Sequence, residues 1–244
     1  HKYPASLMDV IVDENADCKI FNLSVTSNAQ CRKKHMSSWA AIIDKLTFEN
    51  DILFLISVGN IGFHDIQSFI KDGKEYPEYL DEMFCHIANP SQSLFGLSVG
   101  SMNISAFEDE NWISLGDDND ISAFSRIGTG IWDTIKPDVV EYGGSLIISK
   151  NGDNLVKQNS TTSPELLRST LHGGSAIGQD SVGTSFSTPK VAHIAAIIKQ
   201  LYPEEGVNLI RAFIVQGARL PKDYFRNPTK KSIQYFGYGL PSLE

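Results

Sequence analysis

Hydrophobic residues along this chain follow two periodicities that alternate. Trp39, Ile43 and Leu46 stand at i, i+4 and i+7, the spacing of one buried face of a helix. This pattern predicts a helix over residues 35–47, and similar spacing predicts a shorter helix over residues 4–15. Both segments are therefore expected to cover an apolar layer.

Short uninterrupted apolar runs separate these helical segments. Residues 52–58 read Ile-Leu-Phe-Leu-Ile-Ser-Val, which is typical of a strand buried on both faces of a parallel sheet. Residues 18–25, 94–99 and 137–142 are three further predicted strands. Strands that alternate with helices predict an α/β fold, a parallel β-sheet sandwiched by helices with right-handed crossovers. The chain has no linker-like segment and no internal repeat, so residues 1–244 are expected to form one domain.

Two polar segments interrupt this pattern. Residues 108–120 are acidic and predict a surface loop, and residues 150–180 are rich in Asn, Ser, Thr and Gly and predict a long connection. A calcium site is one interpretation of the acidic segment, because hard cations bind several oxygen ligands and the segment offers Asp117, Asp118 and Asp120. Their spacing fits no EF-hand, and acidic loops are usually only solvated. We therefore expect no cofactor, with calcium at this loop as the alternative.

Composition excludes several classes of protein. The 244 residues are 41% apolar, which excludes a disordered chain, and the net charge of −8 lacks the electrostatic footprint of a nucleic-acid binder. The uncharged run over residues 52–63 is shorter than the roughly 18–20 residues that span a bilayer, so no membrane partner is expected. Cys18, Cys31 and Cys85 form no C-x-x-C pair, which argues against a disulfide framework or a zinc site.

The strongest local signal for chemistry lies at residues 183–189, Gly-Thr-Ser-Phe-Ser-Thr-Pro. Gly183 permits a backbone conformation that other residues avoid, and Pro189 suits the first turn of a helix. Ser185 is therefore expected just before the N-terminus of a buried helix, where free N–H groups favour a developing negative charge. The alternative is that Ser185 only caps this helix.

This string, Gly183-Thr184-Ser185-x-Ser187-x-Pro189, resembles the serine motif of the subtilases, the subtilisin-like serine peptidases. Further segments resemble the same family, in the family's order, over most of residues 18–240. They are residues 18–25, 56–60, 94–100, 124–128, 136–140 and 236–240. The resemblance implies a serine endopeptidase that acts on a protein or peptide substrate.

The resemblance also implies roles for particular residues. Ser185 would be the nucleophile, and Asn60, in Ile-Ser-Val-Gly-Asn, would supply the amide of the oxyanion hole. A peptide would lie extended between two walls formed by Ser24, Val25, Thr26, Ser57, Val58 and Gly59. The alternatives are a turn role for Asn60 and ordinary sheet positions for the six wall residues.

The chain also departs from the family pattern. Glu141-Tyr142-Gly143-Gly144 replaces the usual Ala-Pro-Gly, and residues 66–87 are added between two family strands. The Asp and His motifs of the family precede the strand matched by residues 18–25. Because the chain starts at His1 without either motif, we expect the C-terminal two-thirds of a catalytic domain, inactive alone, whose base and orienting Asp come from upstream sequence.

No histidine in the chain replaces the missing base. His172 stands out of order in a Gly/Ser-rich segment, and His193 lies about two helical turns beyond Ser185 and is expected to point along the core.

Two other functions compete with the peptidase hypothesis. One is a non-catalytic peptide-binding pseudopeptidase, which would keep the groove without the base. The other is an α/β-hydrolase-type esterase, which requires a G-x-S-x-G elbow that Gly183-Thr184-Ser185-Phe186-Ser187 lacks. The absence of a secretion signal and the variant at residues 141–144 resemble intracellular bacterial subtilases, so a cytoplasmic location is expected. The sequence does not specify the oligomeric state or the substrate preference.

Overall fold

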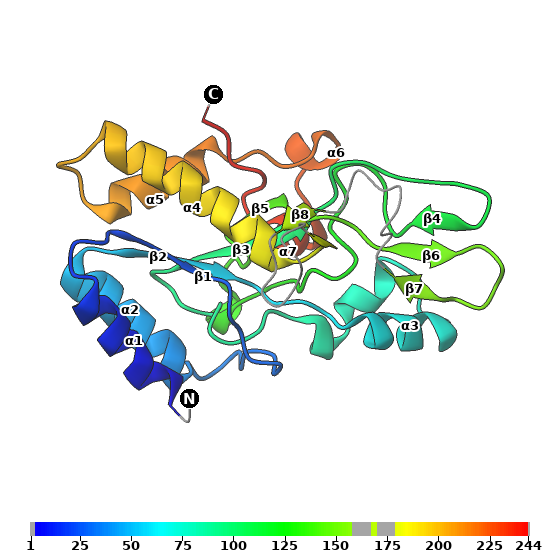
Figure 1. The fold of residues 1–244 in the computed structure, drawn as a ribbon, viewed down its shortest axis with the longest axis horizontal. Coiled ribbons are helices and arrows are strands. Elements are labelled where there is room, and N and C mark those ends of the chain that lie inside the picture. Colours follow the sequence, from blue (N-terminus) through cyan, green and yellow to red (C-terminus); the bar gives the residue numbers. More distant parts are fainter. Residues whose placement is uncertain (1–2, 158–166, 170–178, 244) are drawn as a thin grey trace.

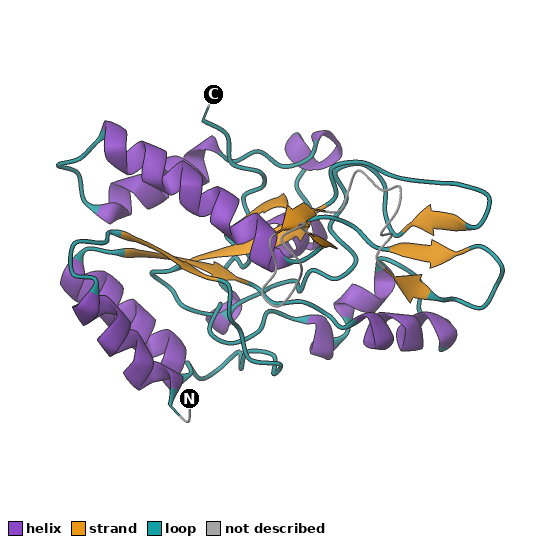
Figure 2. Cartoon of the chain, in the orientation of Figure 1, coloured by secondary structure: helices purple, strands orange, loops and turns teal. Residues whose placement is uncertain are grey.

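A four-stranded parallel sheet forms the centre of the computed structural model, which describes residues 3–157, 167–169 and 179–243 (Figures 1 and 2). Its strands, in spatial order, are β1 (Ile20–Leu23), β2 (Leu53–Ser57), β3 (Leu97–Met102) and β5 (Val139–Tyr142). All three strand pairings are parallel. The predicted α/β fold is therefore confirmed.

Four helices cover the two faces of this sheet (Figure 1). They are α1 (Pro4–Glu14) and α2 (Ser38–Asn50) on one face, and α4 (Thr184–Leu201) and α5 (Val207–Gly217) on the other. The side chains of β2 alternate between the two layers. Phe54 and Ile56 pack with α1 and α2, whereas Leu53 and Leu55 pack with α4 and α5. This two-sided burial explains the uninterrupted apolar run in the sequence.

Most of the remaining elements gather toward one end of the sheet (Figure 1). The helical ones are α3 (Phe63–Lys71), α6 (Lys222–Phe225), α7 (Lys230–Phe236) and three short 3₁₀ turns, Glu78–Asp81, Met83–Cys85 and Ile131–Asp133. The strands are β4 (Trp112–Ser114), β6 (Ile147–Ser149) and β7 (Val156–Lys157) in one antiparallel sheet, and β8 (Leu167–Ser169) and β9 (Gln179–Ser181) in another.

These strands correct two predictions. The acidic segment 108–120 is not loop throughout, because β4 pairs with β6 in antiparallel register, Trp112 opposite Ser149. The connection over residues 150–180 likewise contains β7, β8 and the start of β9 in its described part. Strand β4 is stabilised by its pairing with β6, more than 30 residues away. The charged residues around β4 hid any strand pattern in the sequence.

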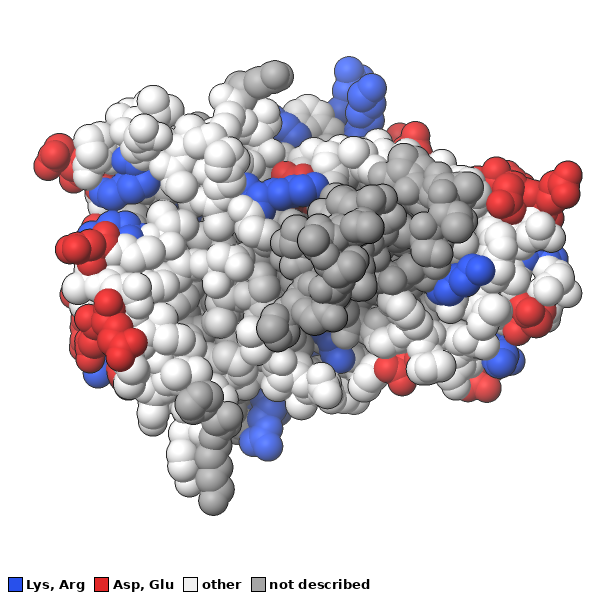
Figure 3. All heavy atoms as spheres, in the orientation of Figure 1, with Lys and Arg blue, Asp and Glu red and all other residues white. Residues whose placement is uncertain are grey.

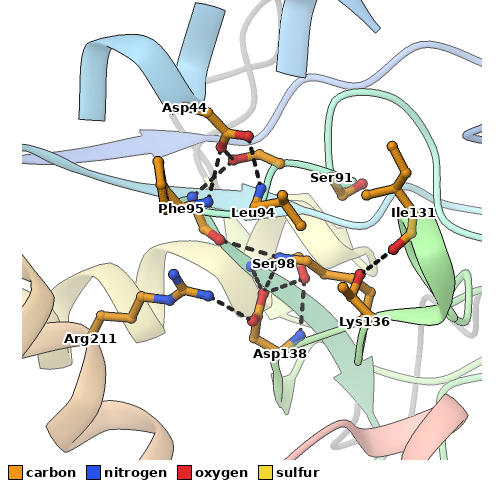
Figure 4. A network of polar contacts seen from close by, with 12 residues as sticks. Asp44, Ser91, Leu94, Phe95, Ser98, Ile131, Lys136, Asp138 and Arg211 are labelled. Carbon is orange, nitrogen blue, oxygen red and sulfur yellow. Dashed lines mark hydrogen bonds and ion pairs between the residues drawn. The ribbon is translucent and has the colours of Figure 1, made fainter. Parts of the chain in front are cut away.

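The predicted third strand begins three residues later than expected, at Leu97. The carboxylate of Asp44 accepts hydrogen bonds from the backbone N–H groups of Leu94 and Phe95, at 3.1 and 2.9 Å (Figure 4). The N–H of Gly96 donates to the Ser93 hydroxyl. The backbone N–H groups of residues 94–96 are therefore bonded to side chains, and the pairing of β3 with its neighbours starts only after them.

A buried ion pair lies just before β5 and is hydrogen-bonded to β3 (Figure 4). The ammonium of Lys136 lies 2.5 Å from the carboxylate of Asp138, and both side chains are almost completely buried. Arg211 approaches the other carboxylate oxygen at 3.4 Å. The backbone N–H and hydroxyl of Ser98 each donate to Asp138 at 2.7 Å. Burial opposes ionisation of Asp138, but the charges of Lys136 and Arg211 and the hydrogen bonds from Lys136 and Ser98 together hold the pKa of this carboxyl below its usual value.

No helix in the described part of the chain is long and apolar enough to cross a membrane.

Candidate active site

The serine motif meets the carboxyl ends of β1 and β2 at one edge of the sheet. A turn at Gly183 (φ +154°) leads into α4, and its N–H donates to the carbonyl of Gly143 at 2.9 Å. Helix α4 begins at Thr184, so Ser185 lies inside the first turn and Pro189 inside the helix. This corrects the prediction that Ser185 precedes the helix and that Pro189 lies in its first turn.

The early start of α4 has a physical cause. The first N–H groups of a helix have no partner within the helix. The N–H of Thr184 is satisfied by the side-chain oxygen of Asn60, at 2.9 Å. Pro189 has no N–H to donate to the carbonyl of Ser185, four residues earlier. The Ser185 carbonyl is instead contacted by the Ser24 hydroxyl, at 3.5 Å.

The hydroxyl of Ser185 points toward the end of β1. Its Oγ donates to the carbonyl of Ser24 at 3.3 Å, and the side chain is partly exposed. Residues 24 and 185 therefore contact each other in both directions, across 161 positions of sequence. This contact places the serine directly against one predicted wall of the peptide channel.

Asn60 lies on the other side of the serine motif. Its Oδ1 accepts from both the N–H and the hydroxyl of Thr184, at 2.9 and 3.0 Å. Its Nδ2 faces Gly183, where an added Cβ would lie 3.1 Å away. Asn60 is exposed, and no described residue accepts a hydrogen bond from its Nδ2. The structure thus brings the amide of Asn60 next to the serine with one end free to donate.

Backbone pairing fixes the position of Asn60. It forms a β-bridge with Ser125, and the N–H of Ile61 donates to the carbonyl of Phe124 at 2.7 Å. The guanidinium of Arg126 donates to the carbonyl of Asn60 at 3.2 Å. A cavity of about 360 Å³ opens beside Asn60, lined by Gly62, Phe63, Phe124 and Val182 among others.

The two predicted walls differ in exposure. Ser24 and Thr26 are half-buried and Val25 is 61% exposed, so this wall presents an accessible strand end. Ser57, Val58 and Gly59 are buried, and the backbone of Val58 is already paired with Val99 and Ala88. The second wall therefore offers little free backbone, and its exposed end begins at Asn60.

Arg126 is a residue of this region that the sequence did not single out. Its guanidinium donates to carbonyls from three segments, those of Asn28, Asn60 and His86, at 3.2, 3.2 and 3.0 Å, and also to that of Phe84. Only 3% of the residue is exposed. It ties the loop after the first wall to the loop that holds Asn60. The sequence did contain a signal for this role, namely a charged residue within the otherwise uncharged segment Phe124–Gly128.

No described histidine reaches Ser185. His35 and His64 are exposed, and His86 is half-buried at a different cavity. His193 is also exposed, which corrects the prediction that it points along the core. Pro189, His193, Ala196 and Gln200 follow one another at helical spacing and form the solvent face of α4. His172 lies outside the described residues.

Two carboxylates of the acidic loop accept hydrogen bonds from backbone N–H groups in or beside the loop. Asp118 accepts from the N–H of Ala106, and Asp120 accepts from the N–H of Asp117 at 2.8 Å. Within the described ranges, no group of three His, Cys, Asp or Glu side chains could hold a metal ion. The expectation of no cofactor stays a prediction.

Comparison with known proteins identifies the family. Residues 3–239 match the profile of the subtilase family. This chain belongs to the subtilase family. Because the chain belongs to this serine peptidase family, the α/β-hydrolase-type esterase is no longer a candidate. The sequence of this subtilase is 27% identical, over 228 residues, to the uncharacterized protein y4bN of Sinorhizobium fredii. That alignment covers 90% of this chain but only 53% of y4bN, so the chain spans about half the length of this curated relative.

Solved structures share the fold of this subtilase. The prenylagaramide maturation protease PagA superposes with a TM-score of 0.55 at 18% identity, covering 98% of this chain and 65% of PagA. The patellamide maturation protease PatA superposes with a TM-score of 0.56 at 17% identity, covering 98% of this chain and 66% of PatA. The parallel sheet flanked by helices is therefore a subtilisin-like protease fold.

Proposed function

We propose that this subtilase is a serine endopeptidase that cleaves protein or peptide substrates through an acyl-enzyme on Ser185. The Ser185 hydroxyl attacks the scissile carbonyl, and the resulting oxyanion accepts hydrogen bonds from the Asn60 amide and the Ser185 N–H. The substrate lies extended between the two walls. The first wall is Ser24, Val25 and Thr26, and the second is Ser57, Val58 and Gly59, which precede Asn60 in the chain. A cytoplasmic location remains a prediction.

One observation supports this proposal above the others. The Oδ1 of Asn60 is taken up by Thr184, which leaves the Nδ2 donor free beside Ser185. A donor fixed in advance stabilises developing negative charge without reorganising during the reaction. A residue that served only as a turn after β2 would not need this contact to a helix 124 residues away.

The general base and its orienting carboxylate are proposed to come from sequence outside these 244 residues. In the described chain the Ser185 hydroxyl donates to the carbonyl of Ser24, and none of the described histidines bonds to it. A serine hydroxyl needs an adjacent base to act as a nucleophile. We therefore expect residues 1–244 alone to be inactive, and the full-length protein to be active.

Hydrolysis of a fluorogenic peptide library by the full-length protein tests the proposal. Turnover is expected, and Ser185→Ala is expected to abolish it. Ser187→Ala is a matched control, because Ser187 is buried and its hydroxyl only donates to the Thr184 carbonyl at 3.0 Å. Equal turnover by Ser185→Ala and the wild type would refute the proposed nucleophile.

A non-catalytic peptide-binding module is the second candidate, and the same absence of a described histidine near Ser185 favours it. Such a protein would bind peptides at the Ser24–Thr26 wall without cleaving them. The sequence upstream of His1 in the full-length protein separates the two. A D-[ST]-G motif followed by H-G-T predicts the enzyme, and their absence predicts the binding module.

A further inference from the structure

Directly after the Ser24–Thr26 wall, the chain forms a loop rich in positive charge. Residues 32–34 read Arg-Lys-Lys and are all exposed. Four backbone hydrogen bonds hold this loop: Ser27 N–H to Asn89, Asn89 N–H to Ala29, Cys31 N–H to Ile87, and Trp132 N–H to Lys33, at 2.8, 3.3, 2.8 and 3.0 Å. The cations are therefore presented by an ordered segment.

This loop borders a cavity of about 770 Å³, which we call the basic groove. Its polar lining includes Arg32, Lys33, Lys34, His35, His86 and Asp81. A second cavity of about 420 Å³ shares Arg32 and His35 and begins at Ser27, the residue that follows the wall. The second cavity therefore extends from the basic groove to the residue that directly follows the Ser24–Thr26 wall.

The basic side chains of the groove are not neutralised by carboxylates of the described residues. Asp81 is the one carboxylate in its lining, and it pairs with Lys231 at 3.1 Å. Arg32, Lys33 and Lys34 form no ion pair with any described residue. The buried Arg126 adds a further positive charge behind the loop, with carbonyls and no carboxylate as its partners.

The position of this cluster stands out because the chain as a whole has a net charge of −8. Figure 3 shows carboxylates mainly toward the two ends of the long axis and Lys or Arg atoms spread over this face, some of which project at the lower edge, near the loop that follows β1 in Figure 1. A protein of this net charge repels anions in general. A local cationic groove beside the channel would reverse that repulsion at one place.

We propose that the basic groove binds acidic side chains of the peptide substrate, on one side of the scissile bond. This inference rests on the proposed function, because it places the substrate's reacting bond at Ser185. Glu and Asp side chains would pair with Arg32, Lys33 and Lys34, while the peptide backbone lies along the Ser24–Thr26 wall. An acidic flank thus recruits the substrate, and a basic flank is rejected.

Binding is the direct test, measured by fluorescence anisotropy with full-length Ser185→Ala protein so that no substrate is consumed. The probes are labelled peptides with one neutral core and a Glu, Gln or Lys pair on its N-terminal or C-terminal side. One Glu-flanked peptide is expected to bind more tightly than its Gln and Lys counterparts. Its affinity should fall as salt rises, because exposed charge pairs are screened.

Removing two positive charges from the groove tests whether it is the site that binds the acidic peptide. The variant Lys33→Ala/Lys34→Ala is expected to weaken binding of the Glu-flanked peptide by roughly three- to tenfold, and to leave the Gln-flanked peptide unchanged. The matched control is Lys45→Ala/Lys222→Ala, which removes two exposed lysines that are not part of the groove lining and should have no effect. Equal losses in the two double variants would overturn the proposal.

Further outcomes separate this inference from the proposed function. Equal affinity for the Glu, Gln and Lys peptides, with normal cleavage by the wild type, refutes the groove and leaves the peptidase standing. Tight, selective binding of the Glu peptide without any cleavage supports the groove and refutes the peptidase. Competition by a single-stranded oligonucleotide of equal charge, at the same affinity, would instead indicate a general polyanion site and overturn the acidic-peptide assignment.

Discussion

At the scale of single residues, a side-chain amide is the main link between the strand end and the serine helix. Asn60 uses its oxygen to satisfy the free N–H of Thr184 and keeps its nitrogen available. The same contact positions the helix start and the donor. Gly183 must stay small, because a Cβ there would lie 3.1 Å from Nδ2 and its φ of +154° suits glycine.

Replacing Asn60 tests this arrangement in the full-length enzyme. Asn60→Ala is expected to lower kcat by about 10²–10³, the loss known for the oxyanion-hole amide of a subtilisin, with little change in KM. Asn60→Asp keeps the shape but lacks the N–H donor, and should lose activity similarly. Asn208→Ala, at an exposed position of α5, is the control and should be silent. A purely structural Asn60 would show the loss in unfolding temperature and not in kcat.

At the scale of elements, helix α4 determines which side chains can take part. Its first turn meets Ser24 and Asn60, whereas Val191, Ala195 and Ile198 pack in the core with α5 and the sheet. The solvent face carries His193. The helix therefore separates a reactive end from a buried face and an exposed face.

Replacement of His193 tests this division. His193→Ala is expected to leave the kcat and KM of the full-length enzyme unchanged, since the side chain is exposed and lies on the face away from the core. Helix propensity favours alanine, so stability should stay equal or rise by a few tenths of a kcal/mol. A loss of kcat at His193→Ala, restored toward the wild type at high pH, would show instead that this imidazole acts as the base.

Much of this element structure could be predicted from the chain, and the failures share a cause. The helices near residues 4–15 and 35–47 and the buried strand at 52–58 follow local hydrophobic periodicity, and all three are present. The start of α4 was wrong because the acceptor for its first N–H is Asn60, far away in sequence. Strand β4 was missed because its partner is β6, beyond a polar segment.

The candidate site shows the same limit. The motif around Ser185 and the Gly-Asn after β2 pointed to the two residues that the fold brings together. Arg126 was missed because its role depends on carbonyls contributed by three segments, a geometry with no local pattern. His193 was misplaced although the signal was in the sequence, because it stands two positions from both Val191 and Ala195, roughly 200° around the helix from the buried face.

At the scale of the whole molecule, the buried carboxylate of Asp138 joins segments that are distant in sequence, through Ser98 and Arg211. Lys136 and Asp138 lie between the sheet and α5, which supplies Arg211. A buried charge without its partner is costly, because water no longer solvates it. Loss of one partner alone is therefore expected to destabilise the protein more than loss of a partner from an exposed pair.

Asp138→Asn tests that expectation by chemical denaturation of the full-length protein. The variant should lose about 3–5 kcal/mol of unfolding free energy at neutral pH, because Lys136 stays buried without a carboxylate. Glu49→Gln breaks an exposed pair on α2 and should cost less than about 1 kcal/mol.

The pH dependence has a defined sign. The pKa of Asp138 is lower in the folded protein, so its contribution is complete above the unfolded-state value of roughly 4 and is lost as pH falls through the folded-state pKa. The difference between wild type and Asp138→Asn should therefore shrink in acid. A difference that stayed constant down to pH 2 would contradict the ion pair.

Ser185 is proposed to act in the full-length protein as an activated nucleophile beside an oxyanion donor. Mass spectrometry of the full-length protein after treatment with a fluorophosphonate measures this most directly. We predict a single covalent adduct on Ser185, absent in Ser185→Ala and formed more slowly in Asn60→Ala. A folded protein that stays unlabelled, or one labelled at another serine while Ser185 remains free, would contradict the account.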